Sequence, residues 1–378
     1  MKMTRKIILL MALIFIQCEN EKDSVELIEK NEEESVTTQE FDRAEMLAFW
    51  VDNIIIPSLE NLEISLNSLE VSVTEFTDNP TSGHLDVLKR KWLAAYIDWQ
   101  YVEMFDIGLA EEIYYKNRMN LYPVNVTRVE NNVVSKNYDL DTSSQFTAQG
   151  FSALDYLIFG IGDNEDAILS LYANRDLNYS HYLNDVTDKM IALTLQVKTQ
   201  WEGDYRDTFI QSIDNTATSS LNKLVNDFVF YYEKGYRAHK IGIPAGIFST
   251  SPLPDRIEAY HGEIYSKILA LEATSAIKQF FNGTGTNDPN TTGLGLKHYL
   301  DYIEADLDTK LSTRINEKFD LSEDKINDLN ANFKQQINED NNAMLLTYDL
   351  IQSNVVLLKV DMLQKLNVSV DYADADGD

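Results

Sequence analysis

Ser152 and Asp155 are the residues of this chain whose types and spacing most directly suggest chemistry. Side chains three residues apart lie on one face of a helix, so this hydroxyl and this carboxylate can converge. A carboxylate is an ordinary ligand for iron or zinc, whereas a serine hydroxyl is a poor one. The same spacing is typical of a capping box, in which Ser152 begins a helix and Asp155 returns to its backbone N–H. We favour capping over metal ligation for this pair.

A second candidate group is formed by Trp99, Glu103 and Asp106, which follow one another at helical spacing. In an expected helix over residues 82–116 they share one face. Glu103 then lies on the apolar face that bears Trp99, where a carboxylate is costly unless it is paired. Glu103 is therefore either a pocket residue or the partner of a buried arginine.

Basic and imidazole side chains near residue 240 complete the candidates. Lys240 or Arg237 could bring positive charge to a pocket for an anionic ligand, although cations at a helix end are often simply solvated. His239 and His261 lie on apolar stripes, where a single histidine is usually a hydrogen-bonded core residue. The predicted ligand or metal pocket consists of Ser152, Asp155, Glu103, Trp99, Asp106 and Lys240.

Several other chemistries lack their residues. The sequence has no Gly-x-Ser-x-Gly elbow, no His-Glu-x-x-His pair, no paired cysteines and no phosphate-binding loop. The acidic residues at 371–378 resemble part of a calcium loop but lack its distal glutamate, so we interpret them as a solvated tail.

The elements that must position these residues are predicted to be helices. The chain has only 15 glycines and 7 prolines in 378 residues, and its apolar residues recur at helical spacing. The wide apolar stripes favour antiparallel bundles and an all-α fold. We expect an N-terminal bundle over residues 41–200, which contains the Ser152 motif, and a C-terminal bundle over 201–370.

Particular helices are expected from the same pattern. They lie at about 41–76 with a kink at Pro57, 82–116, 177–201, 205–240, from Pro254 onward, and 339–366. Residues 122–149 are expected to be irregular.

The first forty residues predict export. Basic residues at positions 2, 5 and 6 precede an apolar run over 7–16, which is too short to span a bilayer. Cys18 follows and is the only cysteine, so we expect a signal peptide over 1–17, lipidation at Cys18 and an acidic tether over 18–40. No later segment is expected to cross a membrane. The predicted location is the cell envelope, at the periplasmic face of the outer membrane or at the cell surface.

The formal charge of the chain is −29. Such a protein repels nucleic acid and anionic lipid headgroups, so we expect no nucleic-acid partner.

Four blocks of the sequence, covering roughly residues 41–378, resemble the imelysin-like family. They are the segment Gly150–Gly160, the tryptophan-rich segment 92–108, the segment 235–246 with its Lys, Pro and Gly, and the acidic ending after Leu358. The resemblance implies two helical bundles, secretion or lipidation, and an association with iron acquisition. The family is also classed as a metallopeptidase on the strength of a His-x-x-Glu pair. This chain has Ser152 in place of the histidine and Asp155 in place of the glutamate.

These departures decide among the functions that the resemblance implies. A catalytic metal needs about three protein ligands, so the substitutions count against a metal-dependent peptidase. We expect a ligand- or partner-binding lipoprotein tied to iron uptake, with iron or zinc bound weakly or not at all. Possible partners are other iron-uptake proteins. A structural or docking lipoprotein remains the other alternative.

Overall fold

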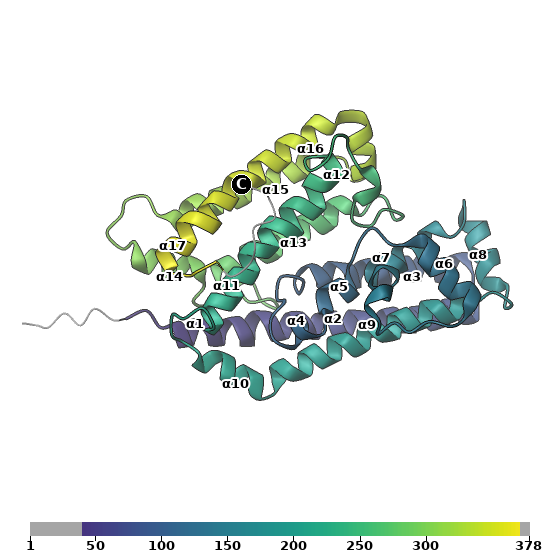
Figure 1. Cartoon of the computed structure of the whole chain (residues 1–378), viewed down its shortest axis with the longest axis horizontal. Helices are drawn as coiled ribbons and strands as arrows, with labels where there is room; N and C mark the ends of the chain where they lie inside the picture. The colour runs from purple at the N-terminus through teal and green to yellow at the C-terminus, as the bar shows by residue number, and fades with distance from the viewer. Residues whose placement is uncertain (1–39, 371–378) are drawn as a thin grey trace, which may run out of the picture. The chain divides into compact units, whose positions relative to one another are not determined.

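The computed structural model describes residues 40–370, and residues 41–370 form one compact unit (Figure 1). The predicted signal peptide, the lipidation site at Cys18, the acidic tether and the acidic tail lie outside the described residues.

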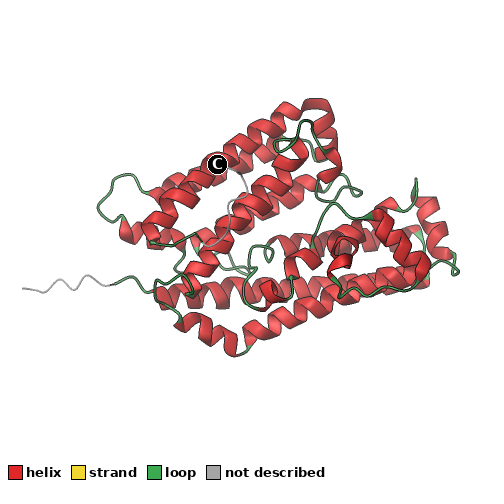
Figure 2. Cartoon of the chain, in the orientation of Figure 1, coloured by secondary structure: helices red, strands yellow, loops and turns green. Residues whose placement is uncertain are grey.

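Helices make up almost all of the regular structure (Figure 2). Within residues 40–370 the only β-type pairing is an isolated bridge between Thr284 and Thr292. The all-α prediction is confirmed. The α-helices are α1 (Arg43–Trp50), α2 (Ile56–Asp78), α3 (Ser82–Gln100), α4 (Leu109–Glu112), α5 (Tyr115–Met119), α6 (Val126–Ser135), α7 (Gly150–Asp155), α8 (Glu165–Ala173), α9 (Tyr179–Glu202), α10 (Asp204–Gln211), α11 (Ser220–Phe230), α12 (Ile243–Ala245), α13 (Ser266–Asn282), α14 (Leu296–Ile303), α15 (Leu311–Asp328), α16 (Phe333–Val356) and α17 (Leu363–Leu366).

Two groups of helices pack side by side. Helix α2 packs against α3 and α9, and α15 packs against α13 and α16. Helix α3 also contacts α13, so the cores of the two groups are continuous. Large buried aromatic residues, among them Trp50, Trp92 and Trp201, fill this core, and burial of such a side chain contributes roughly 2–3 kcal/mol. The predicted division of the chain near residue 200 stays a prediction.

Four segments are π-helical, with one hydrogen bond displaced to i→i+5. They are η1 (Val51–Ile55), η3 (Tyr156–Gly160), η4 (Tyr231–Gly242) and η6 (Leu357–Met362). We predicted a kink at Pro57, and η1 lies just before this proline, where the ring interferes with regular hydrogen bonding.

Helix α3 differs from its prediction in a way that changes the candidate site. Thr81 caps its first turn by accepting a hydrogen bond from the backbone N–H of His84. The helix ends at Gln100, however, and not near residue 116. The prediction that Trp99, Glu103 and Asp106 share one helix is therefore wrong, because Glu103 lies in the turn after α3 and Asp106 in a segment without regular secondary structure.

Two further segments were mispredicted. Residues 122–149, expected to be irregular, contain α6 and a 3-10 turn over 143–148, and the side chain of Asn125 caps α6. The helix expected from Pro254 begins only at Ser266. Residues 257–265 form a loop with left-handed backbone at Ala259 and Glu263, and this loop reaches the site.

The helical segment Phe333–Leu366, which joins α16, η6 and α17 and is kinked at Asp340, is long and apolar enough to cross a membrane by length and composition. This finding corrects the expectation that no later segment meets that test. The helix packs against α15 and η4, and its apolar stripe is buried there, including Met344, Ile351 and Leu358. Core packing accounts for part of its composition, since 44% of its most apolar window is buried while Leu346, Val356 and Val360 are exposed.

Candidate functional site

Helix α7 is positioned by its first residue, Gly150. The backbone of Gly150 is left-handed, with φ +74°, and an added Cβ would lie 2.2 Å from the carbonyl oxygen of Met119. Only glycine fits this close approach. The contact seats α7 directly against the end of α5.

Ser152 and Asp155 use their side chains to hold neighbouring loops. Ser152 Oγ donates to the carbonyl oxygen of Leu121 at 2.7 Å. The two carboxylate oxygens of Asp155 accept backbone N–H bonds from His261 at 2.8 Å and Gly262 at 2.7 Å. The capping-box prediction is wrong, since Gln149 precedes the helix and no side chain caps it. We call this arrangement of Ser152 and Asp155 the clasp.

Burial raises the pKa of Asp155 to about 7, against the two backbone hydrogen bonds, which lower it. Ser152, Asp155 and His261 line a small cavity of about 190 Å³. Burial and the charge of Lys334 lower the pKa of His261 to about 4, so its ring is neutral at pH 7. Within residues 40–370 no three His, Cys, Asp or Glu side chains are placed to hold a metal ion. The clasp therefore does not fit the metal that the family motif implies.

Lys240, on η4, is the centre of a buried polar network. Its ammonium group donates to Glu258 Oε2 at 2.6 Å and to Gln100 Oε1 at 2.7 Å. The other oxygen of Glu258 accepts from Asn120 at 2.8 Å. Lys240 and Glu258 are each only 2% exposed, so a buried ammonium compensates a buried carboxylate. The network joins α3, η4 and the 257–265 loop.

Glu103 is a second carboxylate beside the same ammonium. Its Oε2 atom lies 3.7 Å from Lys240 Nζ, which is an ion pair without a hydrogen bond. The side chain is 93% buried, and Oε2 has no hydrogen-bond partner among residues 40–370. Burial raises the pKa of Glu103, Lys240 lowers it, and Glu258 raises it further. One buried cation thus faces two buried carboxylates.

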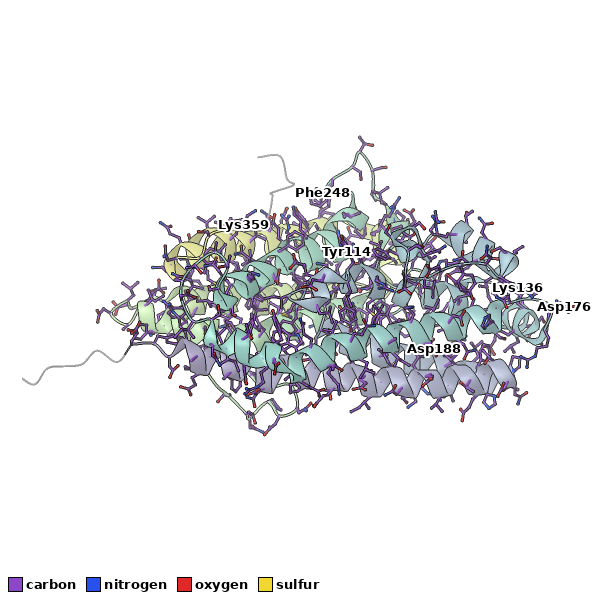
Figure 3. All side chains as sticks on the ribbon, turned by 60° about the horizontal axis from the view of Figure 1, so that its bottom comes forward. Tyr114, Lys136, Asp176, Asp188, Phe248 and Lys359 are labelled. Carbon is purple, nitrogen blue, oxygen red and sulfur yellow. The ribbon has the colours of Figure 1, made fainter. Side chains whose placement is uncertain are left out.

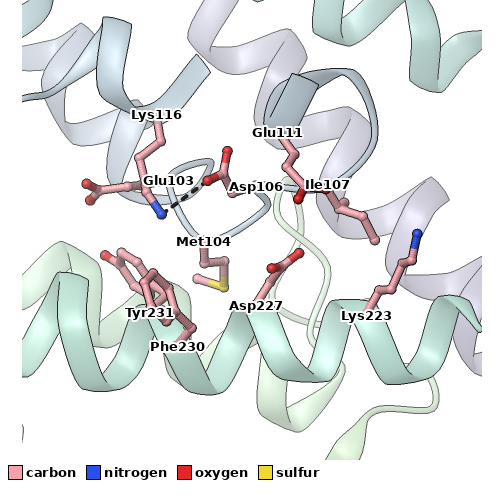
Figure 4. A pocket seen from close by; sticks show the side chains of 10 residues that line it. All are labelled: Glu103, Met104, Asp106, Ile107, Glu111, Lys116, Lys223, Asp227, Phe230 and Tyr231. Carbon is pink, nitrogen blue, oxygen red and sulfur yellow. Dashed lines mark ion pairs between the residues drawn. The ribbon is translucent and has the colours of Figure 1, made fainter. Parts of the chain in front are cut away.

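Glu103 also lines a cleft between the segment 103–122 and the helices α11 and η4 (Figure 4). Two adjoining parts of this cleft have volumes of about 330 and 540 Å³ and share Glu103, Asp106, Glu111, Lys116 and Phe230. We call these two parts together the acidic cleft. It has the size of an ordinary small-molecule site.

Several residues give the acidic cleft its chemistry. Lys116 pairs with Asp106 at 3.2 Å, and its ammonium lies 5.1 Å from the centre of the Phe230 ring. In Figure 4 the Tyr231 hydroxyl lies on the same side of the cleft as the Glu103 carboxylate. The buried hydroxyl has no hydrogen-bond partner among the described residues, and its pKa is raised well above the usual value by burial and by the Glu103 charge.

The structure thus separates the predicted pocket residues. Glu103 and Asp106 line the acidic cleft, Lys240 is buried behind Glu103, and Ser152 and Asp155 line the other cavity. Trp99 packs its ring on Tyr115 and Phe151, in the core.

His239 and His261 belong to no group of three possible metal ligands among residues 40–370. His239 lines the cleft, and burial together with Lys116 and Lys240 lowers its pKa to about 4. The alternative of Glu103 as partner of a buried arginine is wrong, because its partner is Lys240.

Sequence reasoning missed two residues of the site. Glu258 lies in the loop that was expected to be a helix, and Tyr231 was not singled out. A buried lysine needs a carboxylate, which was the one available signal for Glu258.

Comparisons with known proteins place the fold. The chain matches a putative iron-regulated protein A precursor from Parabacteroides distasonis, with a TM-score of 0.68 and 16% identity, over 85% of this chain and 95% of that one. It also matches an imelysin-like protein from Psychrobacter arcticum, with a TM-score of 0.68 and 14% identity, over 88% of this chain and 97% of that one. No curated protein matches in sequence.

The sequence model of one family matches residues 55–359, which is well over half of the chain, and its description is imelysin, peptidase M75. This match agrees with the resemblance seen in Gly150–Gly160 and the other three blocks. The chain belongs to the imelysin family.

Proposed function

We propose that this protein is an exported, lipid-anchored binding protein of iron metabolism, whose ligand binds in the acidic cleft. The observation that carries the proposal is which buried polar atoms have hydrogen-bond partners and which do not. The clasp residues Ser152 and Asp155 hydrogen-bond to backbone groups. At the cleft, Glu103 Oε2 is held only by its ion pair with Lys240, and neither this oxygen nor the buried Tyr231 hydroxyl has a hydrogen-bond partner among residues 40–370. Buried polar atoms without partners are costly, so they are the natural contacts for a ligand.

The link to iron rests on the family and its members. A solved structure of the same fold carries the name of a putative iron-regulated protein. The envelope location and the lipid anchor rest on the sequence pattern that ends at Cys18. Partners would then be other iron-uptake proteins at the same membrane.

A metal-dependent peptidase is the alternative that the family name suggests. It needs a ligand set at Ser152 and Asp155, and the hydrogen bonds of these two residues to backbone groups count against such a set. A metal at Asp155 would have to displace the backbone of His261 and Gly262.

The test uses a variant that fills the acidic cleft from its rim. Lys223 is an exposed residue of α11 that lines the cleft, so Lys223→Trp blocks it with little effect on the core. The purified chain is incubated with small-molecule extracts of iron-limited cells, and bound compounds are detected by native mass spectrometry. We expect a compound that binds the wild type and Ser152→Ala but not Lys223→Trp. A compound that binds all three equally, or none at all, would contradict the proposal.

A further inference from the structure

The acidic cleft carries an excess of buried negative charge. Glu103 and Glu258 are both buried, and Lys240 is the cation between them. Glu258 has strong hydrogen bonds to Lys240 and Asn120, so the poorly compensated group is Glu103. A buried carboxylate without full compensation is costly, and it is relieved either by a proton or by a cation.

Tyr231 offers a second unused contact next to Glu103. Its ring begins η4 and is 2% exposed, and its hydroxyl has no hydrogen-bond partner among the described residues. The charge of Glu103 and a weak hydrogen-bonding interaction with it both raise the pKa of the hydroxyl, so the two groups are close, although their geometry lies outside the limits of a hydrogen bond. A donor placed between them could bond to both oxygens.

Two lysine ammonium groups of the protein already contact carboxylates of the cleft, and their surroundings indicate which donors fit there. Lys116 places its ammonium between the Asp106 carboxylate and the face of the Phe230 ring, which is a typical environment for an ammonium group. Lys240 forms an ion pair with Glu103 on the inner side of its carboxylate. A divalent ion lacks the ligands that it needs, because within residues 40–370 no three His, Cys, Asp or Glu side chains are placed to hold one.

Exposed aromatic surface marks the opening. Tyr114 lines the cleft, is 61% exposed, and has a left-handed backbone with φ 56°. A non-glycine residue in this conformation costs about 1–3 kcal/mol and is typical of functional sites. Its ring contacts that of Phe146, and the residue lines the same part of the cleft as Phe230.

We propose that the acidic cleft binds a primary alkylammonium ligand, whose head group bridges the Glu103 carboxylate and the Tyr231 hydroxyl while its carbon stem lies along Met104 and Phe230. This inference rests on the proposed function, since it names the ligand class of the same cleft. The ammonium donates to the Tyr231 hydroxyl and adds a second cation beside the Glu103 carboxylate. The net charge of −29 also favours a cationic ligand, because anions are repelled.

The experiment is a calorimetric titration of the full-length chain with n-butylamine, n-butanol and butyrate as probes. The amine is expected to bind at one site, and the alcohol and the acid at least tenfold more weakly. Glu103→Gln keeps the shape of the side chain and is expected to weaken amine binding by tenfold or more. Tyr231→Phe removes only the hydroxyl and is expected to weaken it about threefold to tenfold.

Two controls separate the cleft from general charge. Asp188→Asn changes the net charge as Glu103→Gln does, but Asp188 is an exposed residue of α9 outside the cleft, and Figure 3 labels it together with Tyr114. Circular dichroism shows whether each variant is folded. If Glu103→Gln does not fold, the amine affinity of Tyr231→Phe tests the inference. Equal affinity for amine and alcohol, or equal binding to wild type and folded variants, would overturn the inference. If the amine result is negative but Lys223→Trp still abolishes binding of an extract compound, only the proposed ligand class is wrong. If Lys223→Trp does not abolish binding of any extract compound, the proposed function is wrong as well.

Discussion

Asp155 sets two physical effects against each other, and its response to pH shows which one prevails. Burial disfavours the carboxylate, while two backbone N–H bonds from His261 and Gly262 stabilise it. The net result is a folded-state pKa of about 7, raised from 3.8. A raised pKa means that the folded protein holds the proton more tightly, so this contribution to stability is full below about pH 4 and is lost as the pH rises through 7.

The magnitude follows from the shift. Between pH 5 and pH 8, a group with these two pKa values loses about 2–3 kcal/mol of stabilisation. His239 and His261 act in the opposite direction, because their lowered pKa values favour folding at higher pH, above about 6.5. The contribution of Asp155 is therefore isolated as the difference between the wild type and Asp155→Asn, in which the side chain does not ionise.

The assay is urea unfolding followed by tryptophan fluorescence at pH 5, 6, 7 and 8. The stability of the wild type relative to Asp155→Asn should be greater at pH 5 than at pH 8 by about 2–3 kcal/mol. A difference that does not change with pH, or that grows as the pH rises, would refute the reasoning. The second result would show that the backbone bonds outweigh burial and that Asp155 is a stable anion at neutral pH.

Other substitutions test the remaining parts of the site. Gly150→Ala should destabilise the fold by roughly 3 kcal/mol or more, because its left-handed backbone and the carbonyl of Met119 leave no room for a Cβ, and a thermal melt measures this. Lys240→Met should cost about 3–5 kcal/mol, since it leaves Glu258 buried without its cation; a denaturant midpoint equal to that of the wild type would contradict the network. Cys18→Ser should move the protein from the membrane fraction to the soluble fraction on cell fractionation, and unchanged membrane association would argue against lipidation.

The sequence predicted the fold well, because helical periodicity is a local property. The apolar stripe of α3 was recognised from residue spacing. The end of α3 was not, since Gln100 and the residues after it are compatible with helix and are turned away by tertiary contacts. Glu103 was recognised as unusual from its place next to Trp99, although the helix that justified the argument stops before it.

The site itself was predicted only in part, because its contacts join distant segments. Glu258 meets Lys240 through a loop that carries a helical pattern of apolar residues, and backbone N–H groups such as that of Gly262 leave no trace in a sequence pattern. The Ser152 and Asp155 pair was identified from its spacing, but both interpretations offered for it assumed local partners. Its real partners lie 31 and more than 100 residues away along the chain.

The most direct test of the account asks whether the motif at Asp155 binds metal. The full-length chain is titrated calorimetrically with ferrous, ferric and zinc ions, in the wild type, in Asp155→Asn and in Glu103→Gln. We expect no stoichiometric binding that depends on Asp155, because its carboxylate is occupied by the backbone of the 257–265 loop. Tight one-to-one binding that is lost in Asp155→Asn and kept in Glu103→Gln would contradict the account and restore a metal centre at the family motif.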